Sequence, residues 1–98
     1  MMNQIILVGR LTKEVELMEG GKGIITLAIP RSYKNEEGIY ETYFVPCTLW
    51  NGIATNVAEY CKKGDLVGVK GRLQTENNGL VLVAEKVTFL SSAKKDEE

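Results

Sequence analysis

Histidine is absent from this 98-residue chain. Its absence removes the most common general base, the Ser-His and Cys-His nucleophile pairs and most zinc sites. The sequence also has no phosphate-binding P-loop, and its scattered aspartates and glutamates form no paired-carboxylate motif. The chain is therefore not expected to be an enzyme, and no cofactor or metal site is predicted.

Long apolar runs and an excess of charge of either sign are also missing. No apolar run approaches the ~20 residues that a membrane span needs, and the N-terminus lacks the basic region and cleavage site of a signal peptide. We expect a cytoplasmic protein that does not contact membranes. Since the formal net charge is only −1, binding to nucleic acid would have to depend on local basic patches.

Cysteine is scarce, with only Cys47 and Cys61, which lack C-x-x-C spacing. In an intracellular protein such thiols stay reduced, so both are predicted to be small buried hydrophobic side chains. A chain of 98 residues is expected to form one domain, which self-association would help to stabilise.

Strand patterns occupy most of the chain. β-prone runs predict a first strand over residues 4–18, bent at Gly9, and four further strands over 23–31, 42–50, 65–74 and 80–90. A polar hairpin loop is expected over 32–41, and a tight Asn-Gly turn over 75–79. Apolar residues at helical spacing predict one helix over 52–62, with Asn51 as its N-cap and Lys62-Lys63-Gly64 as its C-terminal signal.

This order of three strands, one short helix and two strands is the order of the OB fold. The predicted class is all-β, a five-stranded OB-fold Greek-key barrel with one short helix between strands three and four. Gly9, Gly68 and Gly71 fall where barrel strands need to bend. An SH3-like barrel is the alternative, but it would not place a helix there. The domain is expected over residues 1–91, followed by a short charged, disordered tail over 92–98.

Alternation along the third predicted strand separates two faces. Tyr43, Val45, Cys47 and Leu49 form the better core face. The opposite face, which carries Phe44 and Trp50 together with Thr42, Pro46 and Thr48, suits a surface on which flat rings stack against bases. The alternative is that Phe44 or Trp50 packs beneath a loop or at a subunit contact.

Basic residues lie close to these aromatic positions. In the fourth predicted strand Val67, Val69 and Leu73 share the apolar face, and the opposite face is polar and basic. A second basic group lies at the hairpin entry, and a third lies in the acid-free first thirteen residues. Cations that follow phosphates and rings that stack on bases predict a surface for single-stranded nucleic acid. The residues concerned are Lys70, Arg72 and Gln74, then Arg31, Tyr33 and Lys34, and then Arg10 and Lys13.

Four segments resemble the bacterial-type single-stranded DNA-binding protein family, over roughly residues 2 to 90. They are MNQIILVGRLTKEVEL, ITLAIPRSY, TLWNGIATNVAEYCKKGDLVGVKGRLQT and EKVTFL. The most specific part is WNGIATNVAEYCKKGDLVGVKGRL, which periodicity alone would not produce. The resemblance implies an OB barrel that binds single-stranded DNA without strong sequence preference and protects it during replication, recombination and repair. It also implies a homo-oligomer, usually a tetramer, with a dimer as the alternative.

Position by position, the resemblance implies base stacking by Tyr33, Phe44 and Trp50. Arg10, Arg31, Lys34 and Arg72 fall near the backbone-contacting basic positions of the family. The predicted DNA-binding residues, taking both lines of argument together, are Arg10, Arg31, Tyr33, Lys34, Phe44, Trp50, Lys70, Arg72 and Gln74.

The chain departs from the family pattern at two places. Its hairpin over 75–79 is short and lacks the further stacking aromatic that members usually carry, which suggests a shorter DNA path or weaker wrapping. Its last residues are acidic but lack the long linker and the proline-phenylalanine end through which members recruit partner enzymes, so such recruitment is not expected. A phage or mobile-element protein and a trimmed bacterial core would both look like this.

Two other binding functions compete with single-stranded DNA binding. An OB module whose aromatic face contacts a protein would ignore DNA and its salt dependence. An RNA-binding barrel would be recognised by competition between DNA and RNA of equal length, because the 2′-hydroxyl distinguishes them.

Overall fold

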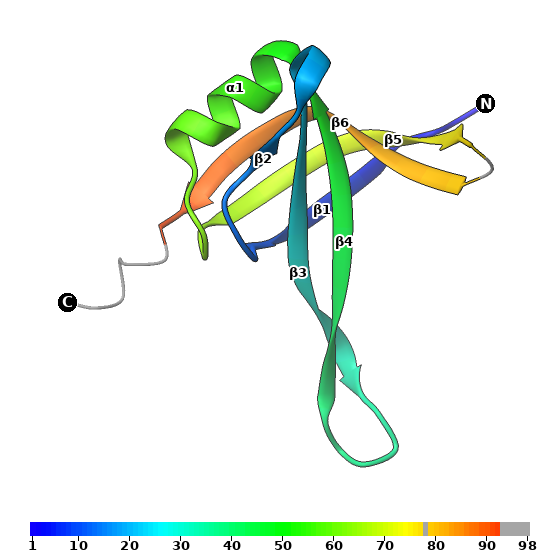
Figure 1. The fold of residues 1–98 in the computed structure, drawn as a ribbon. Coiled ribbons are helices and arrows are strands. Elements are labelled where there is room, and N and C mark those ends of the chain that lie inside the picture. Colours follow the sequence, from blue (N-terminus) through cyan, green and yellow to red (C-terminus); the bar gives the residue numbers. More distant parts are fainter. Residues whose placement is uncertain (78, 93–98) are drawn as a thin grey trace.

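The computed structural model describes residues 1–77 and 79–92 of the chain. In this part the chain forms six strands, one α-helix and one short 3-10 helix (Figure 1). Their bounds are β1 Ile5–Leu11, β2 Glu16–Leu17, η1 Glu19–Gly21, β3 Lys22–Lys34, β4 Tyr40–Trp50, α1 Asn51–Tyr60, β5 Leu66–Glu76 and β6 Gly79–Ser91.

Five of the strands close into a barrel. The sheet runs β1-β5-β6-β4-β3, and β1 also pairs with β3, which completes the circle. All neighbours are antiparallel except β4 and β6, which run parallel and pair at Thr48 and Val83. Together with a ten-residue helix between β4 and β5, this topology confirms the predicted OB fold and excludes the SH3-like alternative.

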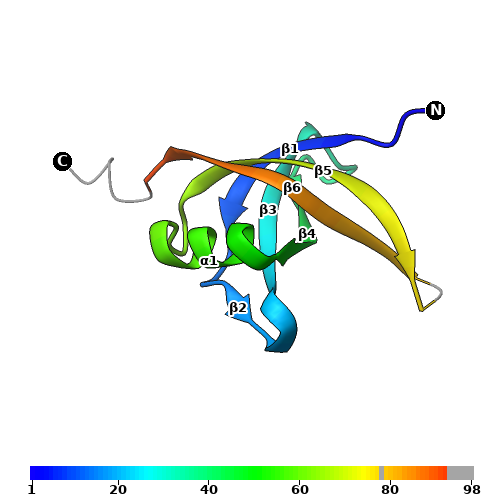
Figure 2. The ribbon, with the colours of Figure 1, turned by 90° about the horizontal axis from the view of Figure 1, so that it is seen from above.

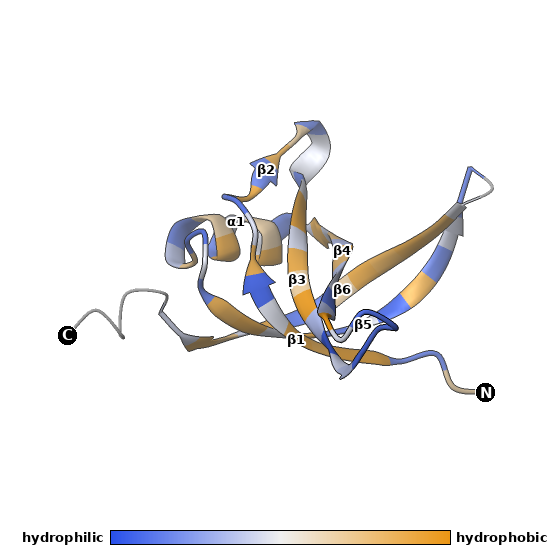
Figure 3. Ribbon diagram, turned by 90° about the horizontal axis from the view of Figure 1, so that it is seen from below, coloured by the Kyte–Doolittle hydropathy of each residue, from blue (hydrophilic) through white to orange (hydrophobic). Residues whose placement is uncertain are grey.

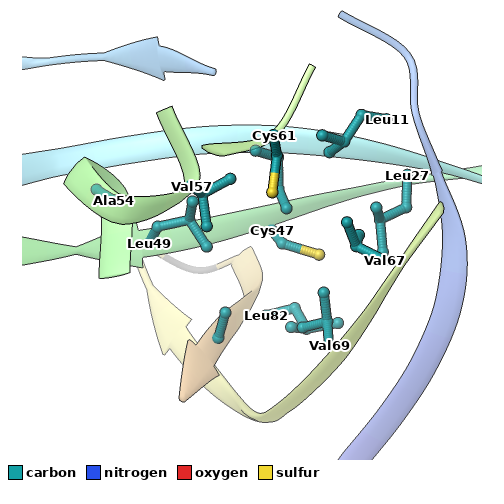
Figure 4. Close-up of a cluster of buried hydrophobic side chains, with 12 residues drawn as sticks. Leu11, Leu27, Cys47, Leu49, Ala54, Val57, Cys61, Val67, Val69 and Leu82 are labelled. Atoms are coloured by element: carbon teal, nitrogen blue, oxygen red, sulfur yellow. The ribbon is translucent and has the colours of Figure 1, made fainter. Parts of the chain in front are cut away.

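The helix α1 covers one end of the barrel (Figures 1 and 2). Its buried residues, Ala54 and Val57, join the barrel core (Figure 4). Ile25, Leu27 and Leu49 are fully buried in this core. Cys47 and Cys61 lie in the same core as free thiols, which confirms the prediction for both. Burial raises the pKa of the Cys47 thiol to about 11.

Two glycines allow the strands to approach one another closely. A Cβ added at Gly9 would lie 2.8 Å from Ile29 Cγ1 and 2.9 Å from the Ala28 carbonyl oxygen, because β1 passes from β5 to β3 at this point. A Cβ at Gly71 would lie 2.3 Å from the Val83 carbonyl oxygen, beside a bulge in the β5–β6 pairing. Of the three glycines predicted as barrel bends, Gly9 and Gly71 therefore need to be glycine. A Cβ at Gly68 would meet no atom closer than 3.7 Å, so the close packing does not require glycine there.

Three predictions for the first strand and the helix are wrong. The first strand does not continue to residue 18: β1 ends at Leu11, and the short β2 pairs separately with β3. Asn51 does not cap the helix. It has a φ of 52°, and the N-cap position is held by Trp50 without a side-chain hydrogen bond. The helix ends at Tyr60, and Gly64, with a φ of 90°, belongs instead to the turn that the Asp65 N–H closes by donating to the Lys62 carbonyl.

The hairpins are longer than predicted. Strands β3 and β4 continue together past the barrel as a projecting hairpin, so the expected loop over 32–41 shrinks to residues 35–39 (Figure 1). Tyr43 and Leu73, expected on the core face, are 50% and 39% exposed because they lie on these hairpins beyond the barrel wall. Asn78 and residues 93–98 of the predicted charged tail lie outside the described residues.

Candidate nucleic-acid interface

Phe44 lies on the outer face of the barrel and is 65% exposed. Its cross-strand partner on β3 is Ala28, and the cross-strand partner of Ala28 on β1 is Arg10. Since residues paired in this way share one face of a sheet, an exposed ring and a guanidinium lie in one row across three strands. Arg10 also donates to the Gly64 carbonyl at 2.9 Å, which holds its side chain in place.

Trp50 lies on the same face of β4, three alternate residues further along. It is 39% exposed, and the Nζ of its cross-strand partner Lys22 lies 5.9 Å from the centre of its ring. Beside it runs a groove of about 210 Å³ between the β3–β4 face and the β5–β6 hairpin. The groove is lined by Lys22, Ile24, Pro46, Thr48, Glu76 and Leu80 to Leu82. In the single chain neither Phe44 nor Trp50 packs into the interior.

Arg72 and Gln74 on β5 are connected to this outer face by the pairing of β5 with β6 and of β6 with β4. Arg72 pairs with Val83, which pairs with Thr48 on β4. The guanidinium of Arg72 binds Glu85 at 3.0 Å and donates to Gln74 at 3.2 Å. Gln74 in turn donates to Glu76, which lines the groove. Both predicted residues thus belong to the groove side of the barrel.

Lys70 lies apart from the groove. Its cross-strand partners are Lys86 on β6 and Ile6 on β1. Ile6 and Val8 are exposed here, and Figure 3 shows the apolar run along β1. The prediction that Lys70, Arg72 and Gln74 form one stripe therefore holds for their side of β5, but Lys70 borders an apolar sheet face rather than the aromatic residues.

Arg31 and Tyr33 occupy the other face of the β3–β4 hairpin. The guanidinium carbon of Arg31 lies 4.4 Å from the Tyr33 ring centre and 5.6 Å from that of Tyr43, and Arg31 forms an ion pair with Glu41. The two tyrosine hydroxyls are 3.5 Å apart. The hydrogen bond with Tyr43, followed by the hydrogen bond and the charge of Arg31, lowers the pKa of Tyr33. The hydrogen bond between the tyrosines raises the pKa of Tyr43. Lys34 lies nearby, its Nζ 5.6 Å from the Tyr40 ring centre.

Three further side chains belong with these groups and were not predicted from the sequence. Lys22 lies beside Trp50 only because of the β3–β4 register, which the sequence does not give. Tyr43 was assigned to the core by alternation, and Tyr40 was placed in a loop. Aromatic residues that recur near Arg31 and Lys34 on both strands of one hairpin are the sequence signal that could have indicated Tyr40 and Tyr43.

The fold and these surfaces define an OB-fold domain with exposed aromatic and basic groups on its outer faces. The family model described as "Single-strand binding protein family" matches residues 2–89. The chain therefore belongs to this family, as the sequence resemblance predicted. The family consists of DNA-binding proteins rather than enzymes, which confirms the prediction that the chain has no catalytic function.

Curated relatives agree with this assignment. The chain is 51% identical to single-stranded DNA-binding protein B of Bacillus subtilis (strain 168), over 79% of this chain and 72% of that protein. It is 45% identical to single-stranded DNA-binding protein 3 of Listeria innocua, over 94% of this chain and 66% of that protein. It is 49% identical to a single-stranded DNA-binding protein of Bacillus cereus, over 79% of this chain and 48% of that protein. The chain thus spans about half to three quarters of these relatives.

A solved structure shares the fold. The SSB domain of a Synechococcus sp. protein matches with a TM-score of 0.72 at 17% identity, over 90% of this chain and 96% of that one.

The α-helix in the described part of the chain is too short to cross a membrane.

Proposed function

We propose that the chain binds single-stranded DNA without strong sequence preference, through base stacking and phosphate contacts, and that it protects such DNA in the cytoplasm during replication, recombination and repair. The observation that carries the proposal is the outer-face row in which exposed Phe44 lies level with Arg10. A ring stacks on any base, because every base has a π-face, and a guanidinium binds the phosphate of any nucleotide.

The test is a titration with oligothymidine, followed by the fluorescence of Trp50, the only tryptophan. We expect strong quenching by single strands and none by duplex DNA of the same length. If about 3–5 phosphates are neutralised, log affinity should fall against log salt with a slope of roughly −2 to −3.5. Unchanged fluorescence without binding would move the function to protein contacts, and stronger competition by oligouridine would favour RNA.

Self-association is the second part of the proposal, with a homotetramer as the expected state and a dimer as the alternative. It is supported by the exposed Ile6 and Val8 on the outer face of β1. A shallow pocket of about 180 Å³ at this face is lined by Ile6, Leu7, Val8, Gly68, Val69, Lys70, Lys86 and Thr88. An exposed apolar sheet face of this kind is typical of subunit contacts.

Replacement of Ile6 by aspartate should break this association, because a charge would have to be buried without a partner. Light scattering is expected to give a multiple of 10.9 kDa for the unchanged chain and 10.9 kDa for the variant. Ile39→Asp is the matched control, since Ile39 is exposed at the β3–β4 turn. Equal masses for Ile6→Asp and the unchanged chain would exclude this face as the contact.

A further inference from the structure

The projecting β3–β4 hairpin carries an arginine enclosed by two tyrosines. Tyr33 and Tyr43 are 54% and 50% exposed, and both rings lie against Arg31. These groups are on the face of the hairpin opposite Phe44, so they form a separate position for one nucleotide, with rings for the base and a guanidinium for the phosphate.

In the structure a carboxylate is already paired with this guanidinium. Glu41 accepts from Arg31 through Oε1 and from the Asn35 amide, at 2.8 Å, through Oε2. The Asn35 side chain is itself fixed, because its oxygen accepts from the backbone N–H groups of Glu37 and Ile39. Arg31 and Asn35 therefore provide two hydrogen-bond donors for an anion, and the Glu41 carboxylate accepts from both.

Arg31 keeps unused hydrogen-bonding capacity. Its Nε is buried and has no hydrogen-bond partner among the described residues. Guanidinium groups bind carboxylate and phosphate oxygens in the same forked geometry. A phosphate that displaced Glu41 would present additional oxygens to the same arginine.

We propose that Glu41 takes the place of a DNA phosphate at Arg31, so that binding at this hairpin exchanges the carboxylate for the phosphate. This inference rests on the proposed function. Glu41 then sets the affinity of the hairpin for DNA: breaking its ion pair is part of every binding event. The Arg31 and Glu41 side chains are 19% and 49% exposed, so the pair is partly open to solvent. Ion pairs at a protein surface correspond to about a two- to fivefold change in an equilibrium constant.

The test is the replacement Glu41→Gln, which removes the charge but keeps an oxygen for the Asn35 amide. The affinity for a fluorescent oligothymidine of about 15 nucleotides, a length that one OB domain can cover, is expected to rise about two- to fivefold. Glu59→Gln is the matched control, because it removes the same charge from an exposed position on α1, away from the hairpin (Figure 1). Equal affinities for the two variants, or weaker binding by Glu41→Gln, would overturn the exchange.

A second pair of variants shows whether the gain depends on Arg31. In an Arg31→Gln background, Glu41→Gln should give no gain, since there is no guanidinium to release. A gain that persists there would also overturn the exchange. Thermal unfolding of each variant checks that the barrel is intact. If the unchanged chain binds no single-stranded DNA, the proposed function and the exchange both fail; if it binds but Glu41→Gln has no effect, only the exchange fails.

Discussion

Phe44→Ala and Trp50→Ala are each expected to weaken binding to oligothymidine by about 1–3 kcal/mol, or roughly 5- to 150-fold. Each replacement removes one stacking platform while leaving the core intact, because both rings are exposed on the outer face. Quenching of Trp50 fluorescence measures DNA binding by the Phe44 variant. Fluorescence anisotropy of a labelled oligonucleotide measures the Trp50 variant, which has no tryptophan left.

Tyr60→Ala is the matched control, because Tyr60 is an aromatic residue at the end of α1, about as exposed as Phe44, and lies outside the proposed interface. It should bind DNA as the unchanged chain does. A similar loss in all three variants would show that the aromatic outer face has no special role. Unfolding of the Phe44 or Trp50 variant would instead assign that ring to packing.

Gly71→Ala should destabilise the barrel by about 3 kcal/mol or more. The new Cβ would lie 2.3 Å from the Val83 carbonyl oxygen and 3.2 Å from Ala84 Cα, so backbone rather than a flexible side chain would have to move. Val83 is the residue of β6 that pairs with β4, and its displacement would strain the closure of the barrel. At about 4–8 °C per kcal/mol, the melting temperature should fall by roughly 12–24 °C.

Gly52→Ala provides the opposite control for this prediction. No atom lies within 4 Å of a Cβ built at Gly52, which is in the first turn of α1. Alanine there should leave stability unchanged or raise it by up to about 1 kcal/mol. A Gly71→Ala chain that melts within about 2 °C of the unchanged protein would contradict the close approach of β5 and β6.

Local patterns were sufficient to predict the order of elements and most of the core. Cys47 and Leu49, and Val67 and Val69, alternate into the barrel as expected. Alternation gives the side of a strand on which a residue lies, but not the point at which the strand leaves the barrel. Tyr43 and Leu73 were misassigned for this reason. Asn51 was misassigned because the asparagine that favours an N-cap also tolerates a positive φ.

The candidate site was predictable only in part. Period-two alternation placed Phe44 and Trp50 on one face without knowledge of the neighbouring strands. The placement of Arg31 depends on the irregular pairing between Pro30 and Lys34, where extra residues of β3 oppose Glu41. The ion pair between Arg31 and Glu41 follows from that bulge, and no spacing rule in the sequence indicates it.

The position of β1 between β5 and β3 also affects how the chain is made. Ile5 pairs with Gly71. The first strand therefore cannot pair with its main partner, β5, until most of the polypeptide has been synthesised. At about 5–20 residues per second the ribosome takes several seconds over this stretch, whereas a hairpin such as β3–β4 forms in about 1–10 μs. During each round of translation, the apolar first strand is therefore the segment for which a chaperone or a neighbouring nascent chain competes longest.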